Sequence, residues 1–81
     1  MKRSSIVKRC ELVLSDCYNF TDFEIFEGVD CFYVEFQTNF YFGCSIHESE
    51  ICDIIFVKKK LGACSYYVDL RDNSIIYLFK L

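Results

Sequence analysis

The chain has 81 residues, a formal net charge of −3, nine Phe and six Tyr. This length supports one domain over residues 1–81, because a second hydrophobic core would lack apolar surface. The negative charge argues against a nucleic-acid binder, which normally carries a basic excess to neutralise phosphates. The sequence shows neither a signal-peptide core nor an apolar stretch of roughly 20 residues that would span a membrane. We therefore expect a cytoplasmic protein, of a bacterium or of an infected cell, that makes no membrane contact.

Residues 5–19 place apolar side chains at the three-and-four spacing of one helical face, with charged residues opposite. Ser4 or Ser5 is suited to cap the helix start. The pattern predicts a helix over 5–19. A strand over 9–14 is the alternative, because apolar and polar residues also alternate there.

From Phe23 onward the chain is rich in aromatic and β-branched residues, which favour strands. We predict a strand beginning at Phe23, a turn at 28–30 and a second strand over 31–36. A three-residue loop at 37–39 then leads to a third strand over 40–46. The opposed pairs on its apolar face would be Phe36 with Phe40, Val34 with Phe42 and Phe32 with Cys44.

A two-residue loop would invert one of these strands and mix core and solvent faces, so burial favours the longer loop. In that register the outer face shows Tyr33 across from Gly43 and Glu35 across from Tyr41. The position of Tyr33 opposite Gly43 also has a purely structural explanation, in which the ring covers the bare backbone of the glycine.

Residues 49–61 predict a second helix, with acidic residues near its start, three lysines near its end and Gly62 just beyond. Ser49 is the expected cap. The apolar run 54–57 leaves a buried strand as the alternative.

The carboxyl-terminal residues predict a hairpin around the turn 71–74, with Leu70 opposite Ile75. Apolar residues occur on both of its faces, so we expect the hairpin to be central in the sheet or covered on both sides. The predicted fold is α+β: an antiparallel sheet of about five strands, with two hairpin regions, packed with two helices. The two similar segments 6–9 and 56–59 are too short to indicate an internal repeat.

Six cysteines in a short secreted chain would indicate disulfides, but without a secretion signal we interpret all except Cys31 as small core residues. Cys44, His47 and Cys52 have some of the spacing of a zinc site, yet neither a Cys-x-x-Cys pair nor a second His completes four ligands. Cys44 and His47 would point to opposite sides of a strand and could not form a catalytic pair. We predict no catalytic residue, metal or cofactor.

The leading hypothesis is a small non-enzymatic module that binds a larger protein partner by occupying its surface. Aromatic residues bordered by charges are typical of tight interfaces, and Tyr33, Glu35 and Tyr41 are the candidate partner-binding residues. In size and simplicity the chain is similar to phage-borne inhibitors of host defence systems, anti-CRISPR proteins among them. That similarity is one of class and involves no shared motif.

Two other functions remain open. The protein is either a self-assembling homodimer that uses Tyr67, Ile76 and Leu78, or a small metal- or ligand-binding protein that uses the Cys44, His47 and Cys52 set. Nucleic-acid binding ranks last. It would need the lysines at 58–60 to meet Lys8 and Arg9 in space.

Overall fold

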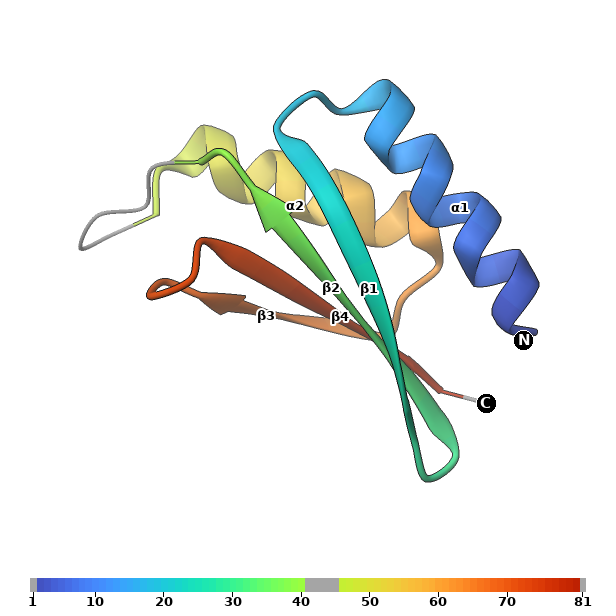
Figure 1. Ribbon diagram of the computed structural model, residues 1–81. Coiled ribbons are helices and arrows are strands. Elements are labelled where there is room, and N and C mark those ends of the chain that lie inside the picture. Colours follow the sequence, from blue (N-terminus) through green and yellow to red (C-terminus); the bar gives the residue numbers. More distant parts are fainter. Residues whose placement is uncertain (1, 41–45, 81) are drawn as a thin grey trace.

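The computed structural model describes residues 2–40 and 46–80, and it has an α+β fold in which two helices pack on one antiparallel sheet (Figure 1). The strand order is β1-β2-β4-β3. The elements in chain order are α1 (Arg3–Asp16), β1 (Phe20–Gly28), β2 (Cys31–Thr38), α2 (Glu48–Leu61), β3 (Ser65–Asp69) and β4 (Ser74–Lys80).

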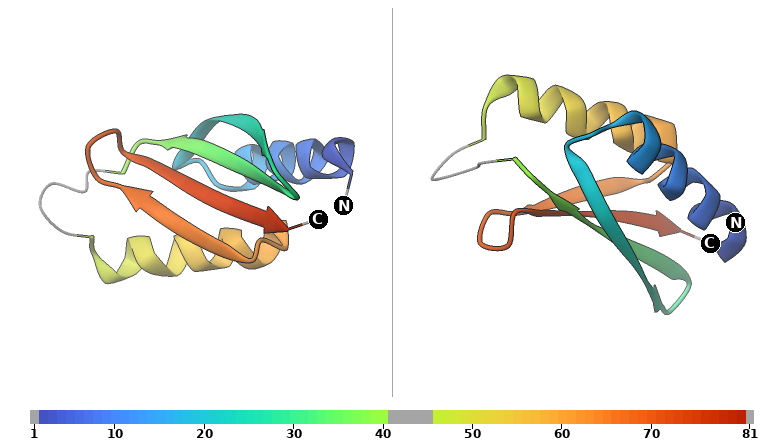
Figure 2. Two further views of the ribbon diagram at one scale, coloured as in Figure 1. Left: turned by 90° about the horizontal axis from the view of Figure 1, so that it is seen from below. Right: turned by 45° about the horizontal axis from the view of Figure 1, so that its top comes forward.

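Both helices lie on the same side of the sheet, and the other side is not covered by a described element (Figures 1 and 2). The order of elements is that of two consecutive units, each a helix followed by a hairpin. The central strands β2 and β4 join the two hairpins into one sheet. The short sequence similarity between the two helices did not reveal this arrangement.

Helix α1 confirms the predicted first helix and excludes the alternative strand, but its ends differ from those expected. It begins at Arg3 and ends at Asp16, and its N-cap residue, Lys2, makes no side-chain capping hydrogen bond. The predicted serine cap is therefore wrong. Ile6, Cys10 and Val13 are buried, as the helical spacing predicted, so tertiary packing of one face stabilises a helix that lacks a good cap.

Helix α2 confirms the second predicted helix and excludes the alternative strand. Its N-cap residue is His47 and not the predicted Ser49, and no side chain caps it. The predicted glycine end is confirmed, since Gly62 has a left-handed φ of 76°. Arg9 of α1 donates from Nη1 to the carbonyl oxygen of Leu61 at 2.8 Å, so α1 also satisfies the last turn of α2.

The first hairpin confirms the predicted strand, turn and strand, but β1 begins at Phe20 instead of Phe23, and β2 continues to Thr38 through two residues of the predicted loop at 37–39. Gly28 pairs with Cys31, which leaves Val29 and Asp30 as a two-residue turn. Asp30 takes a positive φ of 57°, a conformation that Asp tolerates better than most residues.

The described residues form four strands and not the predicted five or so. Both edges of β2 are already paired, so the predicted third strand has no place beside it. Strand β1 lies along one edge and β4 along the other, where Phe36 pairs with Ile75 and not with Phe40. Phe40 follows β2 as a buried residue outside the sheet. Residues 41–45, which include most of the predicted third strand, lie outside the described residues.

The second hairpin is present, but its register is shifted by two residues from the prediction. Ile75 pairs with Val68 instead of Leu70, so the turn spans four residues, 70–73. The Asp69 carboxylate accepts hydrogen bonds from the backbone N–H groups of Arg71 and Asp72, and this interaction fixes the longer turn. Because the shift is an even number, the faces of both strands are as predicted.

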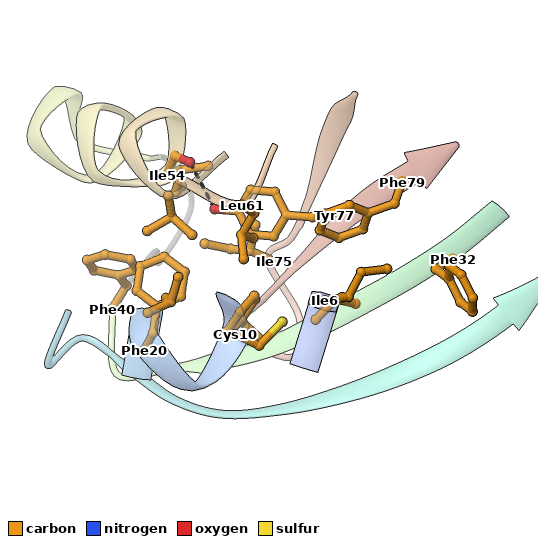
Figure 3. Close-up of a cluster of buried hydrophobic side chains, with 14 residues drawn as sticks. Ile6, Cys10, Phe20, Phe32, Phe40, Ile54, Leu61, Ile75, Tyr77 and Phe79 are labelled. Carbon is orange, nitrogen blue, oxygen red and sulfur yellow. Dashed lines mark hydrogen bonds between the residues drawn. The ribbon is translucent and has the colours of Figure 1, made fainter. Parts of the chain in front are cut away.

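The core lies between the helices and the sheet (Figure 3). Ring edges meet ring faces within it, with Phe36 5.4 Å from Phe20 and 5.7 Å from Tyr77 between centroids. The buried Tyr77 hydroxyl donates to the Ile54 carbonyl oxygen at 2.9 Å, which satisfies the polar end of this side chain (Figure 3). The buried apolar residues are Ile6, Cys10, Val13, Phe20, Phe32, Val34, Phe36, Phe40, Ile54, Val57, Leu61, Ile75, Tyr77 and Phe79.

The cysteines do not share one environment. All five in the described residues are free thiols, and Cys10 alone among them is fully buried. The interpretation of Cys52 and Cys64 as core residues is wrong, because both are exposed.

Candidate functional site: the open face of the sheet

Alternate residues of the four strands point away from the helices and form what we call the open face. Two adjacent rows of paired residues cross it from β1 to β3. The first row is Glu24, Glu35, Ile76 and Tyr67, and the second is Phe26, Tyr33, Leu78 and Ser65.

The open face is hollowed at its centre. A cavity of about 360 Å³ is open to solvent between these rows. Every strand contributes at least one side chain to its wall. The lining residues are Phe26, Tyr33, Glu35, Tyr67 and Ile76.

Three aromatic side chains at this cavity remain accessible to water. Phe26 is 45%, Tyr33 40% and Tyr67 65% exposed. Single exposed apolar residues are ordinary, but a group of them around one hollow is a feature of binding surfaces. The alternation of the strands therefore builds an aromatic surface on the side of the sheet opposite the core.

Carboxylates border the aromatic residues. Glu24 and Glu35 are directly opposite each other on β1 and β2, an arrangement of like charges that destabilises a strand pair. Glu35 lines both the aromatic cavity and a neighbouring one of about 250 Å³, which also includes Asp22, Glu24 and Gln37. The described residues form no ion pair with either glutamate.

Glu35 and Tyr33 are both held in place by neighbours. The buried Ser74 hydroxyl donates to Glu35 Oε2 at 3.4 Å. The Tyr33 ring lies over Gly28, where a Cβ atom would come within 3.0 Å of Tyr33 Cε2 and 2.8 Å of Cys31 Sγ. A hydrogen bond with the Cys31 side chain raises the pKa of the Tyr33 hydroxyl.

The structure brings two of the three predicted binding residues together. Tyr33 and Glu35 are both on the open face, whereas Tyr41 lies outside the described residues. The predicted neighbours of Tyr33 and Glu35 were wrong, since the strand opposite them is β4. Tyr33 covers Gly28, and Gly43 lies outside the described residues.

The residues proposed for a homodimer are on the same face. Tyr67 and Ile76 line the cavity, and Leu78 pairs with Tyr33 beside it. The binding-module and homodimer hypotheses therefore describe one surface. Phe26 was missed, although pairing residues back from the two-residue turn places it opposite Tyr33.

The other hypotheses gain less from the geometry. Cys44 lies outside the described residues, and His47 and Cys52 are exposed. Within residues 2–40 and 46–80 no group of three or more His, Cys, Asp or Glu side chains could hold a metal ion. The nucleic-acid hypothesis requires basic residues of the two helices to meet. Arg9 of α1 does contact α2, and Lys60 of α2 does contact α1, but Arg9 binds the end of α2 and Lys60 pairs with Asp16.

No helix in the described part of the chain is long and apolar enough to cross a membrane. No family model, curated protein or solved structure matches the chain.

Proposed function

We propose that the protein is a non-enzymatic binding module that uses its open face to occupy the surface of a larger protein partner. The observation that carries the proposal is the cavity lined by Phe26, Tyr33 and Tyr67 on the side of the sheet away from the helices. Rigid aromatic side chains present a large contact area at little cost in conformational entropy, and they dominate the binding energy of many interfaces.

The position of these residues on strands supports the same proposal. Strands hold side chains more firmly than loops do, so the aromatic surface is formed before a partner binds. Polar and charged residues surround it, as they surround the apolar centre of typical protein interfaces. The specific form that we favour is an inhibitor of a host defence system carried by a phage or mobile element, anti-CRISPR-like in class, because the chain is small and its described residues contain no metal cluster.

A symmetric homodimer through the open face is the second candidate, supported by the same aromatic surface. Charge weighs against it. The outward positions carry four acidic residues and one basic residue, so two copies would bring like charges together. These residues are Asp22, Glu24, Glu35 and Asp69 against Lys80. Sedimentation velocity over a range of concentrations separates a monomer from such a dimer.

The test is a comparison of three affinity baits in lysate of the organism that carries the gene, or of its bacterial host for a phage gene. The first bait is the natural protein, and the second carries Tyr33→Ala, Glu35→Ala and Tyr67→Ala on the open face. The third is a matched control with Tyr18→Ala, Glu11→Ala and Phe56→Ala, three exposed residues on other surfaces. Circular dichroism and urea unfolding establish that each bait is folded.

We expect a stoichiometric partner that the natural protein and the control retain and the open-face variant loses. A partner retained equally by all three folded baits would place binding on another surface. A concentration-dependent dimer that the open-face substitutions dissolve, with no other protein bound, would favour the homodimer.

A further inference from the structure

We propose that the partner inserts an arginine side chain into the cavity of the open face, with its guanidinium group at Glu35 and Glu24. This inference rests on the proposed function and names the chemistry of the partner. Two features carry it: the order of residues along the two rows, and the carboxylates that border the apolar cavity.

The first step concerns the two glutamates. Glu24 and Glu35 are directly opposed residues on adjacent strands, and no described cation forms an ion pair with either carboxylate, although the Ser74 hydroxyl donates to Glu35 Oε2. Like charges in that position disfavour the free sheet. A cation from a partner would remove this repulsion, so the free energy that the sheet loses through the pair is recovered on binding.

The second step concerns the aromatic rings next to the glutamates. Phe26 and Tyr33 are each one row from Glu24 and Glu35, and Tyr67 closes the cavity from β3. The face of an aromatic ring attracts a cation, most strongly where water is displaced. Because Glu35 lines both cavities, one long side chain can contact the rings and the carboxylates together.

The third step selects arginine among cationic groups. Its planar guanidinium stacks on aromatic rings and donates hydrogen bonds to two carboxylates, whereas an ammonium group is compact and strongly hydrated. The methylene stem of arginine also suits the apolar wall formed by Ile76. Charge complementarity across the face therefore favours a basic protein surface over a second copy of this acidic chain.

The experiment uses small probes on the isotope-labelled full-length chain. The backbone amide signals of Phe26, Tyr33, Tyr67 and Ile76 are followed by nuclear magnetic resonance during titration. The probes are the acetylated methylamides of arginine, of citrulline and of lysine. Citrulline has nearly the shape of arginine without its charge. The same titrations are made with a Glu24→Gln and Glu35→Gln double variant, and with Glu27→Gln as the matched control.

We expect the arginine probe to shift these four signals and to bind about fivefold more tightly than the citrulline probe. The double variant should lose that preference, and Glu27→Gln should retain it, since Glu27 is paired with Arg3 on the other face. Equal binding of citrulline, shifts elsewhere in the chain, or an unchanged preference in the double variant would overturn the inference. Tighter binding of the lysine probe would overturn the choice of arginine.

The failures of the two proposals can be told apart. If the open-face variant loses its partner while arginine and citrulline bind alike, the face is a protein interface without an arginine site. If the arginine probe binds at the cavity but the open-face substitutions leave partner capture unchanged, the cation site exists and the proposed function is wrong.

Discussion

The two faces of the sheet are built from alternate residues of the same four strands, yet they use aromatic side chains in opposite ways. On the helix side Phe36 and Tyr77 are completely buried, and their rings pack edge to face. On the open face Phe26, Tyr33 and Tyr67 surround a cavity and remain between 40% and 65% exposed.

This difference separates stability from binding in a very short chain. Burial of apolar area contributes about 25 cal/mol per Å², so rings on the helix side stabilise the fold while those on the open face leave much of that free energy unused. The unused part is available to a partner.

The largest effect is expected from Phe36→Ala. Removing this fully buried ring leaves a cavity among Phe20, Phe23 and Tyr77, which should lower the free energy of unfolding by about 3 to 5 kcal/mol. Urea unfolding followed by circular dichroism measures the loss. Phe26→Ala on the open face is the matched control and should cost no more than about 1 kcal/mol. Similar losses for the two variants would show that Phe26 is also a core residue.

The second effect is a difference in thiol reactivity. Burial raises the pKa of Cys10 to about 12, and its thiol is enclosed beneath α1, while Cys52 and Cys64 are exposed. We expect alkylation of Cys10 to be slower on the order of a thousandfold, because it requires opening of the fold. Peptide mapping by mass spectrometry gives each rate. In concentrated urea all rates should converge, and rapid labelling of Cys10 without urea would contradict the described core.

The third effect concerns the Tyr77 hydroxyl. Tyr77→Phe removes its hydrogen bond to the Ile54 carbonyl and should cost about 1 kcal/mol at neutral pH. Burial raises the pKa of Tyr77 above the usual value of about 10. The contribution of Tyr77 to stability is therefore complete below about pH 10 and falls as the pH rises further, because the Tyr77 hydroxyl loses its proton first in the unfolded chain.

The free energy of unfolding of the variant should decline less above that pH. Part of the decline should persist, since the thiol of Cys10 contributes a loss of the same sign. Tyr67→Phe is the control, because this ring is exposed. An equal alkaline decline in the natural protein and in Tyr77→Phe would show that Tyr77 is not held in its neutral form.

The features that local patterns determine were predicted from the sequence. Helical spacing identified α1, whereas the placement of acidic residues, lysines and Gly62 identified α2. The faces of β3 and β4 were also correct despite the shifted register, because the alternation of side chains is unchanged by a shift of two residues. Tyr33 and Glu35 were selected for the same reason, as outward residues among aromatic ones.

The features that depend on distant contacts were not predicted. The neighbour of β2 proved to be β4, some 40 residues later in the chain, and local pairing had suggested the segment that follows β2 directly. This error separated Tyr33 from Tyr67 and Ile76, which the sheet brings to one cavity. The two hypotheses about binding therefore appeared distinct, although one surface carries both.

The smallest effect compares two glutamates of β1 that point to opposite sides of the sheet. Glu24→Gln should raise the free energy of unfolding by about 0.3 kcal/mol, because it ends the repulsion with Glu35. Glu27→Gln should lower it by a similar amount, because Glu27 Oε1 accepts a hydrogen bond from Arg3 Nη1 at 3.0 Å in an exposed ion pair.

Urea unfolding at low and high salt measures both changes, which should shrink as salt screens the charges. A loss of stability in Glu24→Gln would mean that a cation already neutralises the pair and that the cavity does not need one from a partner. If Glu24→Gln makes the protein more stable but weakens binding of the arginine probe, the same residue has opposite effects on stability and on binding. That combination is the mark of a side chain retained for binding at the expense of the fold.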